Sequence, residues 1–209
     1  MSINNKQPHR GWAVLSTGAS LIILVIVSVW AMTVFNDYLL QRGWQVSASQ
    51  TSRFRAAVKN YVGRYYDTLL ASAGTTSPVV VTPAMLKNTG FLEPGFSETT
   101  ADGQSFRAAV TRNAINTDQL QGLVVTQGGS DLPFKALRNI SVDIEGLGGY
   151  VWNSANVTGA MESWSVPLVS FGVSTTSGIS PRCCPLMNWA RPGLKATACT
   201  AFRLPANLT

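Results

Sequence analysis

A run of 24 uncharged residues, Trp12 to Phe35, constrains this chain of 209 residues more than any other feature. Because roughly 20 helical residues cross the hydrocarbon of a bilayer, the run is long enough to span a membrane. An ordinary signal-peptide core has only about 7–15 apolar residues. The sequence therefore predicts a membrane segment behind a short basic leader, in a protein of the cell envelope.

The apolar run continues into an amphipathic stretch with helical spacing. Its apolar residues recur every three or four positions: Phe54, Val58, Tyr61, Tyr65 and Leu69. This spacing is that of one helix face. Since no proline occurs in residues 9–77, we expect a single helix from about Trp12 to Ser72, stopped at Gly74. Its first half would lie in lipid and its second half would pack on a globular body.

Beyond the helix, the pattern changes to short β-rich runs and turn signals. The sequence VVVTPAMLKNTG predicts a short strand and then a short helix, with Thr82 as its N-cap and Pro83 at its first position. Asp102-Gly103 is a hairpin-type dipeptide. The runs Gln104–Arg112 and Leu120–Gln127 then predict an antiparallel pair of strands.

The remainder of the body predicts one more helix and two more strands. The helix would open at Asp131 and Pro133, end at Gly146, and bury one face: Phe134, Leu137, Ile140 and Ile144. Tyr150–Asn153 and Glu162–Phe171 are predicted strands, and Pro167 places the second at an edge or a bulge. The fold class is α+β, a long helix on a small antiparallel β-sheet. The C-terminal tail from about Thr175 shows no apolar period, so we expect it to be irregular.

Charge is distributed unevenly along the chain, which carries a net charge of +6. Residues 77–171 hold five Lys or Arg against eight Asp or Glu, so the excess of positive charge lies in the leader, the helix and the tail. Basic residues spread along a helix usually form a solvated face. We therefore expect no nucleic-acid partner.

All three cysteines, Cys183, Cys184 and Cys199, lie in the tail. In an oxidising compartment Cys199 could form a disulfide with one of the adjacent pair, whereas three free thiols would suit a reducing one. Three cysteines without a nearby histidine make a poor zinc site. We expect neither a metal nor a cofactor.

The residue types that catalysis requires are scarce. The one histidine, His9, lies in the leader, and no cysteine precedes Cys183, so the body can hold no Ser/His or Cys/His pair. Asp143 and Glu145 read as a solvated pair near a helix end, and we assign them no role. Trp152 and Trp164 could line a sugar-binding surface, although tryptophans in strands more often belong to the core. The sequence predicts no enzyme and no catalytic residues.

A chain with this leader, helix and small β-domain resembles a type IV pilin. Its segments resemble, in order, the shufflon constant region of PilV-type minor pilins of type IVb thin pili: GWAVLSTGASL, GFLEPGF, GQSFRAAVTRN, LQGLVVTQGG, LPFKALRNIS, IEGLGGYV and SWSVPLVSFG. On this resemblance the chain divides into a prepilin leader, a transmembrane and stalk helix, a pilin globular domain and a variable tail, at residues 1–11, 12–73, 74–174 and 175–209.

The resemblance implies specific processing. Prepilin peptidase would cut between Gly11 and Trp12 and leave the apolar helix intact, with its N-terminus in the cytoplasm. Type IV pilins usually have glutamate at mature position five, where it neutralises the terminal amine of a neighbouring subunit. Ser16 occupies that position here, so the pairing is unavailable, which fits a subunit present in few copies because an uncompensated buried amine is costly.

The resemblance also implies a partner set and a function. Such proteins join the major pilin and other subunits, pass through the inner membrane, and end in an extracellular pilus. A tip-located subunit would act as an adhesin for recipient lipopolysaccharide in conjugative mating, through a tail exchanged by DNA inversion. The tail here has an unusual composition, so we expect a truncated or out-of-frame variant.

Three alternatives accompany this interpretation. Val29 and Ala31 fit a signal-peptidase site, and cleavage there would expose Met32. A membrane-anchored, pseudopilin-like factor would instead prime pilus assembly without contacting a recipient cell. A periplasmic enzyme acting on envelope sugars is the most remote alternative.

Overall fold

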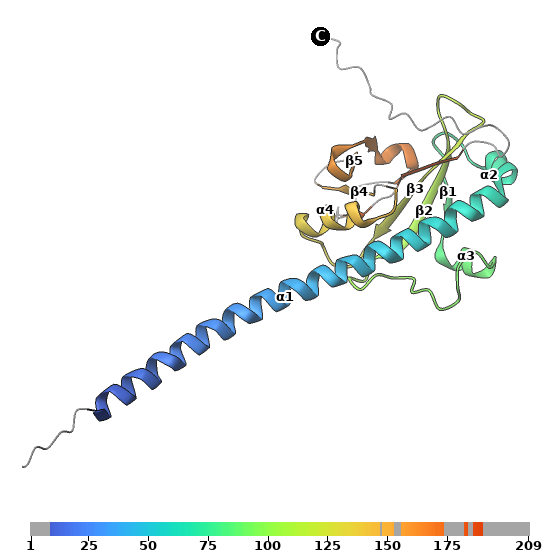
Figure 1. Ribbon diagram of the computed structural model, residues 1–209. Coiled ribbons are helices and arrows are strands. Elements are labelled where there is room, and N and C mark those ends of the chain that lie inside the picture. Colours follow the sequence, from blue (N-terminus) through green and yellow to red (C-terminus); the bar gives the residue numbers. More distant parts are fainter. Residues whose placement is uncertain (1–8, 147, 153–155, 174–181, 184–185, 190–209) are drawn as a thin grey trace, which may run out of the picture. The chain divides into compact units, whose positions relative to one another are not determined.

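The computed structural model describes residues 9–146, 148–152, 156–173, 182–183 and 186–189 (Figure 1). The chain divides into two compact units, Met1–Arg42 and Gly43–Thr209, which are described separately below. Helix α1 (His9–Arg64) contributes to both, and the second unit adds short helices and two antiparallel sheets. The α+β class is confirmed.

Helix α1 begins three residues before the expected start and ends before the expected stop. The prediction of one uninterrupted helix to Ser72 is wrong, because Tyr65 leaves helical geometry (φ −107°, ψ 30°) and a separate helix α2 (Tyr66–Ser72) follows. The break lets two adjacent tyrosines take different partners. The Tyr65 ring lies on Phe91 at the surface, while Tyr66 enters the core and donates a hydrogen bond to the Asp118 carbonyl.

The first sheet has the strand order β1-β2-β3-β8 and is antiparallel throughout. Its strands are β1 (Val79–Val81), β2 (Ser105–Arg112), β3 (Leu120–Gln127) and β8 (Leu186–Trp189). The predicted pairing of the two central runs is confirmed, with Ser105 opposite Gln127 and Arg112 opposite Leu120. Helix α3 (Pro83–Asn88) is also as predicted, because the Thr82 hydroxyl accepts the Met85 N–H and Pro83 opens the helix.

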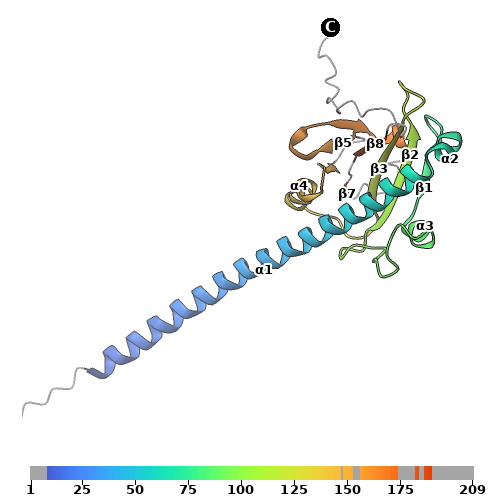
Figure 2. The ribbon, with the colours of Figure 1, turned by 45° about the vertical axis from the view of Figure 1, so that its right-hand side comes forward.

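Both faces of this sheet are covered, which explains why its central strands are apolar almost throughout. On one face, Phe106, Val110 and Val124 pack against Phe54, Val58 and Val62 of α1. The views in Figures 1 and 2 show the last part of α1 lying along the sheet. On the other face, Ala109, Leu123 and Val125 pack against residues of the second sheet.

Helix α4 (Phe134–Asp143) connects the two sheets. Leu137, Ile140 and Ile144 are buried together as predicted, whereas Phe134 remains 39% exposed and its ring contacts Tyr150 and Trp152. Gly146 ends the segment with a φ of +77°, which favours glycine.

The second sheet has the order β6-β5-β4-β7 and is also antiparallel. Its strands are β4 (Gly149–Val151), β5 (Asn156–Gly159), β6 (Ser165–Pro167) and β7 (Arg182–Cys183). The prediction of one strand over Glu162–Phe171 is wrong, because 3₁₀ turns η1 (Ala160–Glu162) and η2 (Leu168–Phe171) flank a strand of three residues. Pro167 does lie in an edge strand, as predicted.

Strands β7 and β8 lie in the segment that the sequence predicted to be irregular. Each supplies the last strand of one sheet, β7 beside β4 and β8 beside β3. Part of the tail therefore belongs to the folded body.

Candidate functional surfaces

The first unit presents an apolar helical surface. Every large apolar side chain from Leu21 to Leu40 is about half exposed or more, up to 67% at Trp30. The stretch Ser20–Arg64 of α1 contains a segment long and apolar enough to cross a membrane. Exposed apolar surface of this extent requires lipid or another apolar surface to cover it.

Two hydroxyl groups within this apolar segment bond to backbone carbonyls of the same helix. The Ser28 hydroxyl donates to the Leu24 carbonyl at 2.7 Å, and the Thr33 hydroxyl donates to the Trp30 carbonyl at 2.7 Å. An unpaired hydroxyl in hydrocarbon would cost free energy, so these bonds adapt the segment to an apolar environment.

An aromatic and cationic pair marks the end of the apolar segment. Arg42 Nε donates to the Tyr38 hydroxyl at 2.9 Å, and the guanidinium carbon lies 5.2 Å from the centre of the Tyr38 ring. Tyrosine and long basic side chains are typical of the boundary between hydrocarbon and headgroups. This pair was not predicted from the sequence, although Tyr38 and Arg42 are the first Tyr and Arg after the uncharged run and were a usable signal.

The residues expected at the processing site lie in α1. Gly11, Trp12 and Ser16 all fall within its first eight residues, where the structure describes the backbone alone. Cleavage after Gly11 and the role of Ser16 therefore remain predictions.

The cysteine prediction also remains open. Cys183 is the second residue of β7 and pairs in register with Tyr150. Cys184 and Cys199 lie outside the described residues.

The carboxylates of Asp143 and Glu145 lie on the surface at the end of α4. Asp143 is its last residue, and both side chains are exposed. The Glu145 backbone is held against α1, because its N–H donates to the Ser52 hydroxyl and its carbonyl accepts from Arg55 Nη1 at 2.7 Å. Burial lowers the pKa of Arg55, and the nearby Glu145 carboxylate partly opposes this. The Glu145 backbone thus belongs to the contact between α1 and the segment that follows α4.

The two tryptophans have different surroundings. Trp164 is half-buried and its indole lies over Gly149 and Gly159, where an added Cβ would come within 2.7 Å and 2.5 Å of the ring. It is a packing residue. Trp152 is 40% exposed, and its ring centre lies 5.2 Å from that of Phe134.

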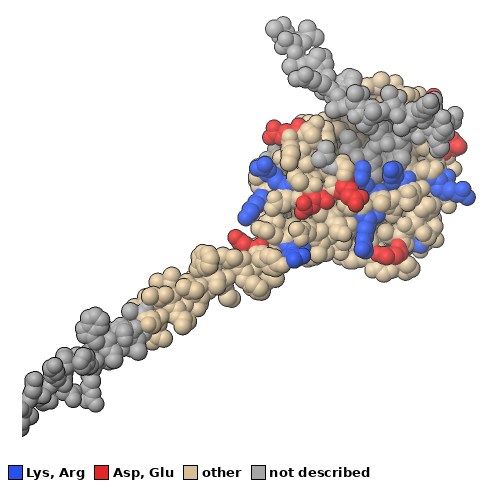
Figure 3. Space-filling model, in the orientation of Figure 1, with Lys and Arg blue, Asp and Glu red and all other residues tan. Residues whose placement is uncertain are grey.

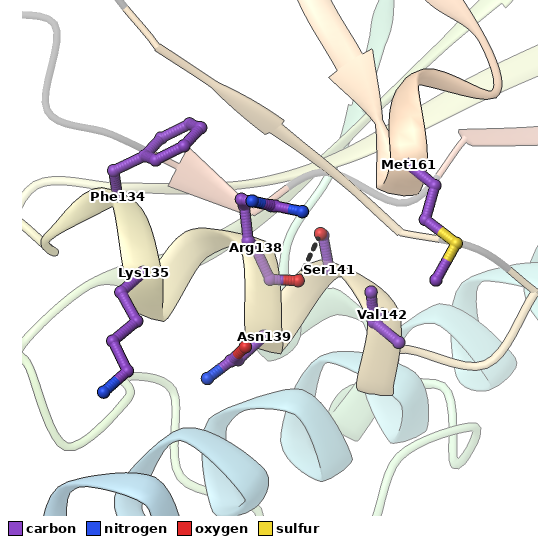
Figure 4. A pocket seen from close by; sticks show the side chains of 7 residues that line it. All are labelled: Phe134, Lys135, Arg138, Asn139, Ser141, Val142 and Met161. Carbon is purple, nitrogen blue, oxygen red and sulfur yellow. Dashed lines mark hydrogen bonds between the residues drawn. The ribbon is translucent and has the colours of Figure 1, made fainter. Parts of the chain in front are cut away.

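A groove beside α4 was not foreseen from the sequence (Figure 4). It is lined by Phe134, Lys135, Arg138, Asn139, Ser141, Val142 and Met161. Met161 is 80% exposed and has a φ of 54°, which is unusual for a residue with a side chain. The helical spacing of the α4 residues could have predicted one wall of this groove. The position of Met161 could not be predicted, because it lies in η1, whose place depends on the second sheet.

The groove contains no constellation for catalysis. Its polar groups are a lysine, an arginine, an asparagine and a serine whose hydroxyl donates to the Arg138 carbonyl at 2.8 Å. Among the described residues, no group of three His, Cys, Asp or Glu could hold a metal ion. On the face seen in Figure 3, basic and acidic side chains are interspersed over the body, without a continuous basic stripe.

Comparison with known proteins identifies the family. The family model of the bacterial shufflon protein, N-terminal constant region, matches residues 37–181. Shufflon proteins A', B and A of Escherichia coli are each 45% identical to this chain over 174 residues, or 83% of it. The same match covers 40%, 39% and 37% of those relatives, so the chain spans about two fifths of their length. No solved structure matches. The chain belongs to the bacterial shufflon protein family, through its N-terminal constant region.

Proposed function

We propose that this protein is a minor subunit of a type IVb pilus, inserted in the inner membrane as a prepilin and then placed at the tip of the extracellular fibre. The observation that supports this proposal most directly is the apolar surface from Leu21 to Leu40, which is exposed along its whole length. Lipid would cover this surface before assembly, and the helices of the major pilin and other subunits would cover it in the fibre.

Processing by prepilin peptidase between Gly11 and Trp12 would retain this surface, with the N-terminus on the cytoplasmic side. Ser16 supplies no carboxylate to compensate a neighbour's terminal amine. A subunit present in few copies tolerates this loss better than a major subunit does, because the cost of an unpaired buried charge arises at each copy.

The second part of the proposal is an adhesive role in conjugative mating. The body would present the chain beyond the constant region to lipopolysaccharide of the recipient cell. Support comes from the membership of the shufflon family. No catalytic activity is proposed.

Deletion of residues 190–209 tests the adhesive role. The deletion begins after Trp189 because β7 and β8 belong to the sheets, so removing them would damage the body as well. We expect pili that still contain the variant, and mating in liquid reduced to the level of a strain without the protein. A full-length chain carrying Ile115→Ala, at a side chain 85% exposed, is the control.

Two outcomes would contradict the proposal. Unchanged mating would show that residues 190–209 do not recognise the recipient. Loss of pili would instead favour the priming factor, since an adhesive tail is not needed to build the fibre.

A further inference from the structure

The groove beside α4 combines an apolar wall with two cations (Figure 4). The apolar wall consists of Phe134 and Val142 on α4, 39% and 46% exposed, and of Met161 on η1. Lys135 and Arg138 are three positions apart on α4, so they are neighbours on the helix surface. Within the described residues, neither cation forms a salt bridge and no carboxylate lines the groove. The groove therefore favours an anionic ligand that also has an apolar face.

An aromatic surface and an amide narrow the chemistry of that ligand. The Trp152 ring is 40% exposed, and its centre lies 5.2 Å from that of Phe134. An exposed aromatic face packs against the C–H face of a sugar ring, because the π-system is negative and the C–H hydrogens are positive. Asn139 in the groove both donates and accepts hydrogen bonds, as sugar hydroxyls do. These groups together match an anionic sugar.

The backbone holds Met161 at the groove in an unfavourable conformation. Met161 (φ 54°, ψ 28°) and the adjacent Glu162 (φ 58°) are both left-handed, which is costly for residues that carry a Cβ. The Met161 side chain is 80% exposed, so its own burial does not offset this cost. Strain of this kind collects where a fold holds a side chain for binding. A ligand in the groove would bury Met161 and account for its position.

The size of the groove suits a small molecule. Its volume is about 390 Å³, within the range of about 300–1,000 Å³ that small-molecule sites occupy. We propose that the groove binds a phosphorylated saccharide. The apolar wall contacts the sugar ring, Asn139 bonds to its hydroxyls, and Lys135 and Arg138 pair with the phosphate. The site is formed without residues 190–209, so it does not depend on the adhesive role proposed above.

Titration of the full chain in detergent micelles, followed by NMR of the α4 amides, tests the proposal. The probes are glucose 6-phosphate, glucose, inorganic phosphate and a peptide of alternating Glu and Leu. We expect glucose 6-phosphate to shift the amides of residues 134–142 and to bind about tenfold more tightly than each of the others. Glucose and inorganic phosphate each supply only part of the contacts.

Substitutions of the two cations test their role. Lys135→Gln and Arg138→Gln should each weaken the binding of glucose 6-phosphate about tenfold and leave the binding of glucose unchanged. Lys59→Gln, at an exposed lysine of α1 outside the groove, is the matched control and should bind as the unchanged chain does. Deletion of residues 190–209 should also leave the affinity unchanged, which separates this site from the adhesive role.

Met161→Gly separates binding from folding. Glycine accepts the left-handed backbone, so the variant should unfold at a denaturant concentration no lower than the unchanged chain does. It should bind glucose 6-phosphate about tenfold more weakly, because it lacks part of the apolar wall. Glu162→Gly relieves the same kind of strain at a residue that does not line the groove, and it should bind at least as tightly as the unchanged chain.

Several results would overturn the proposal. No binding of glucose 6-phosphate would do so directly. Equal binding of inorganic phosphate would show that the site recognises charge alone, and equal binding of glucose that the cations take no part. Tighter binding of the peptide would indicate a docking site for a protein segment. Unaltered binding by Met161→Gly, or loss of binding on deletion of residues 190–209, would show that the groove is not the site.

Discussion

At the scale of single residues, the packing of one tryptophan ring against two glycines holds strands of the second sheet together. Trp164 lies over Gly149 and Gly159, so the two strands that carry these glycines share one aromatic cover. The Gly159 N–H also donates to the Trp164 carbonyl at 2.7 Å. An aromatic ring over glycine excludes water from a strand that has no side chain of its own to do so.

This contact predicts a coupling between two substitutions. Gly159→Ala should lower the free energy of unfolding by about 1–3 kcal/mol, because the new methyl would lie 2.5 Å from the indole nitrogen. In a Trp164→Ala background the same change should cost less than about 0.5 kcal/mol, since the obstacle is gone. Denaturant unfolding followed by circular dichroism in detergent measures both.

Gly95→Ala is the control for this cycle, because an added Cβ there meets no atom within 4 Å. Equal costs of Gly159→Ala in the two backgrounds would show that Trp164 does not cover Gly159.

The structural role of a residue could be predicted where it depends on sequence neighbours. It could not be predicted where it depends on partners far away along the chain. The Thr82 cap and the positive φ of Gly146 follow from a few neighbouring residues. The burial of Gln104 does not, because its amide donates to the carbonyl of Ser130 and accepts from the Thr126 hydroxyl. Both partners lie more than twenty positions away along the chain.

At the scale of elements, the apolar half of α1 is the part whose environment the sequence determines. Its side chains are exposed and its hydroxyls bond within the helix, as lipid requires. The later elements were harder to predict. The single strand expected over Glu162–Phe171 breaks into turns because η2 buries Leu168 and Phe171 together, which alternating strand geometry does not do.

A charge within this helix should impair membrane integration. Ile26→Lys places an ammonium in the middle of the apolar segment, at a cost of about 2.5–3.5 kcal/mol. We expect less of this variant in the membrane pellet after alkaline carbonate extraction of cells. Gln41→Lys, beyond the apolar segment, should stay in the pellet as the unchanged chain does, and equal behaviour of the two variants would contradict a spanning helix.

At the scale of the whole molecule, an apolar helix that requires lipid or neighbouring subunits to cover it continues into a body of two antiparallel sheets. The processing site could be expected only from resemblance to pilins, because Gly11 and Trp12 carry no distinctive physical signal of their own. The most direct test is the intact mass and N-terminal sequence of the protein recovered from sheared pili. We expect a chain that begins at Trp12 and keeps its apolar helix. A chain that begins at Met32, or one absent from the pili and found free in the medium, would contradict it.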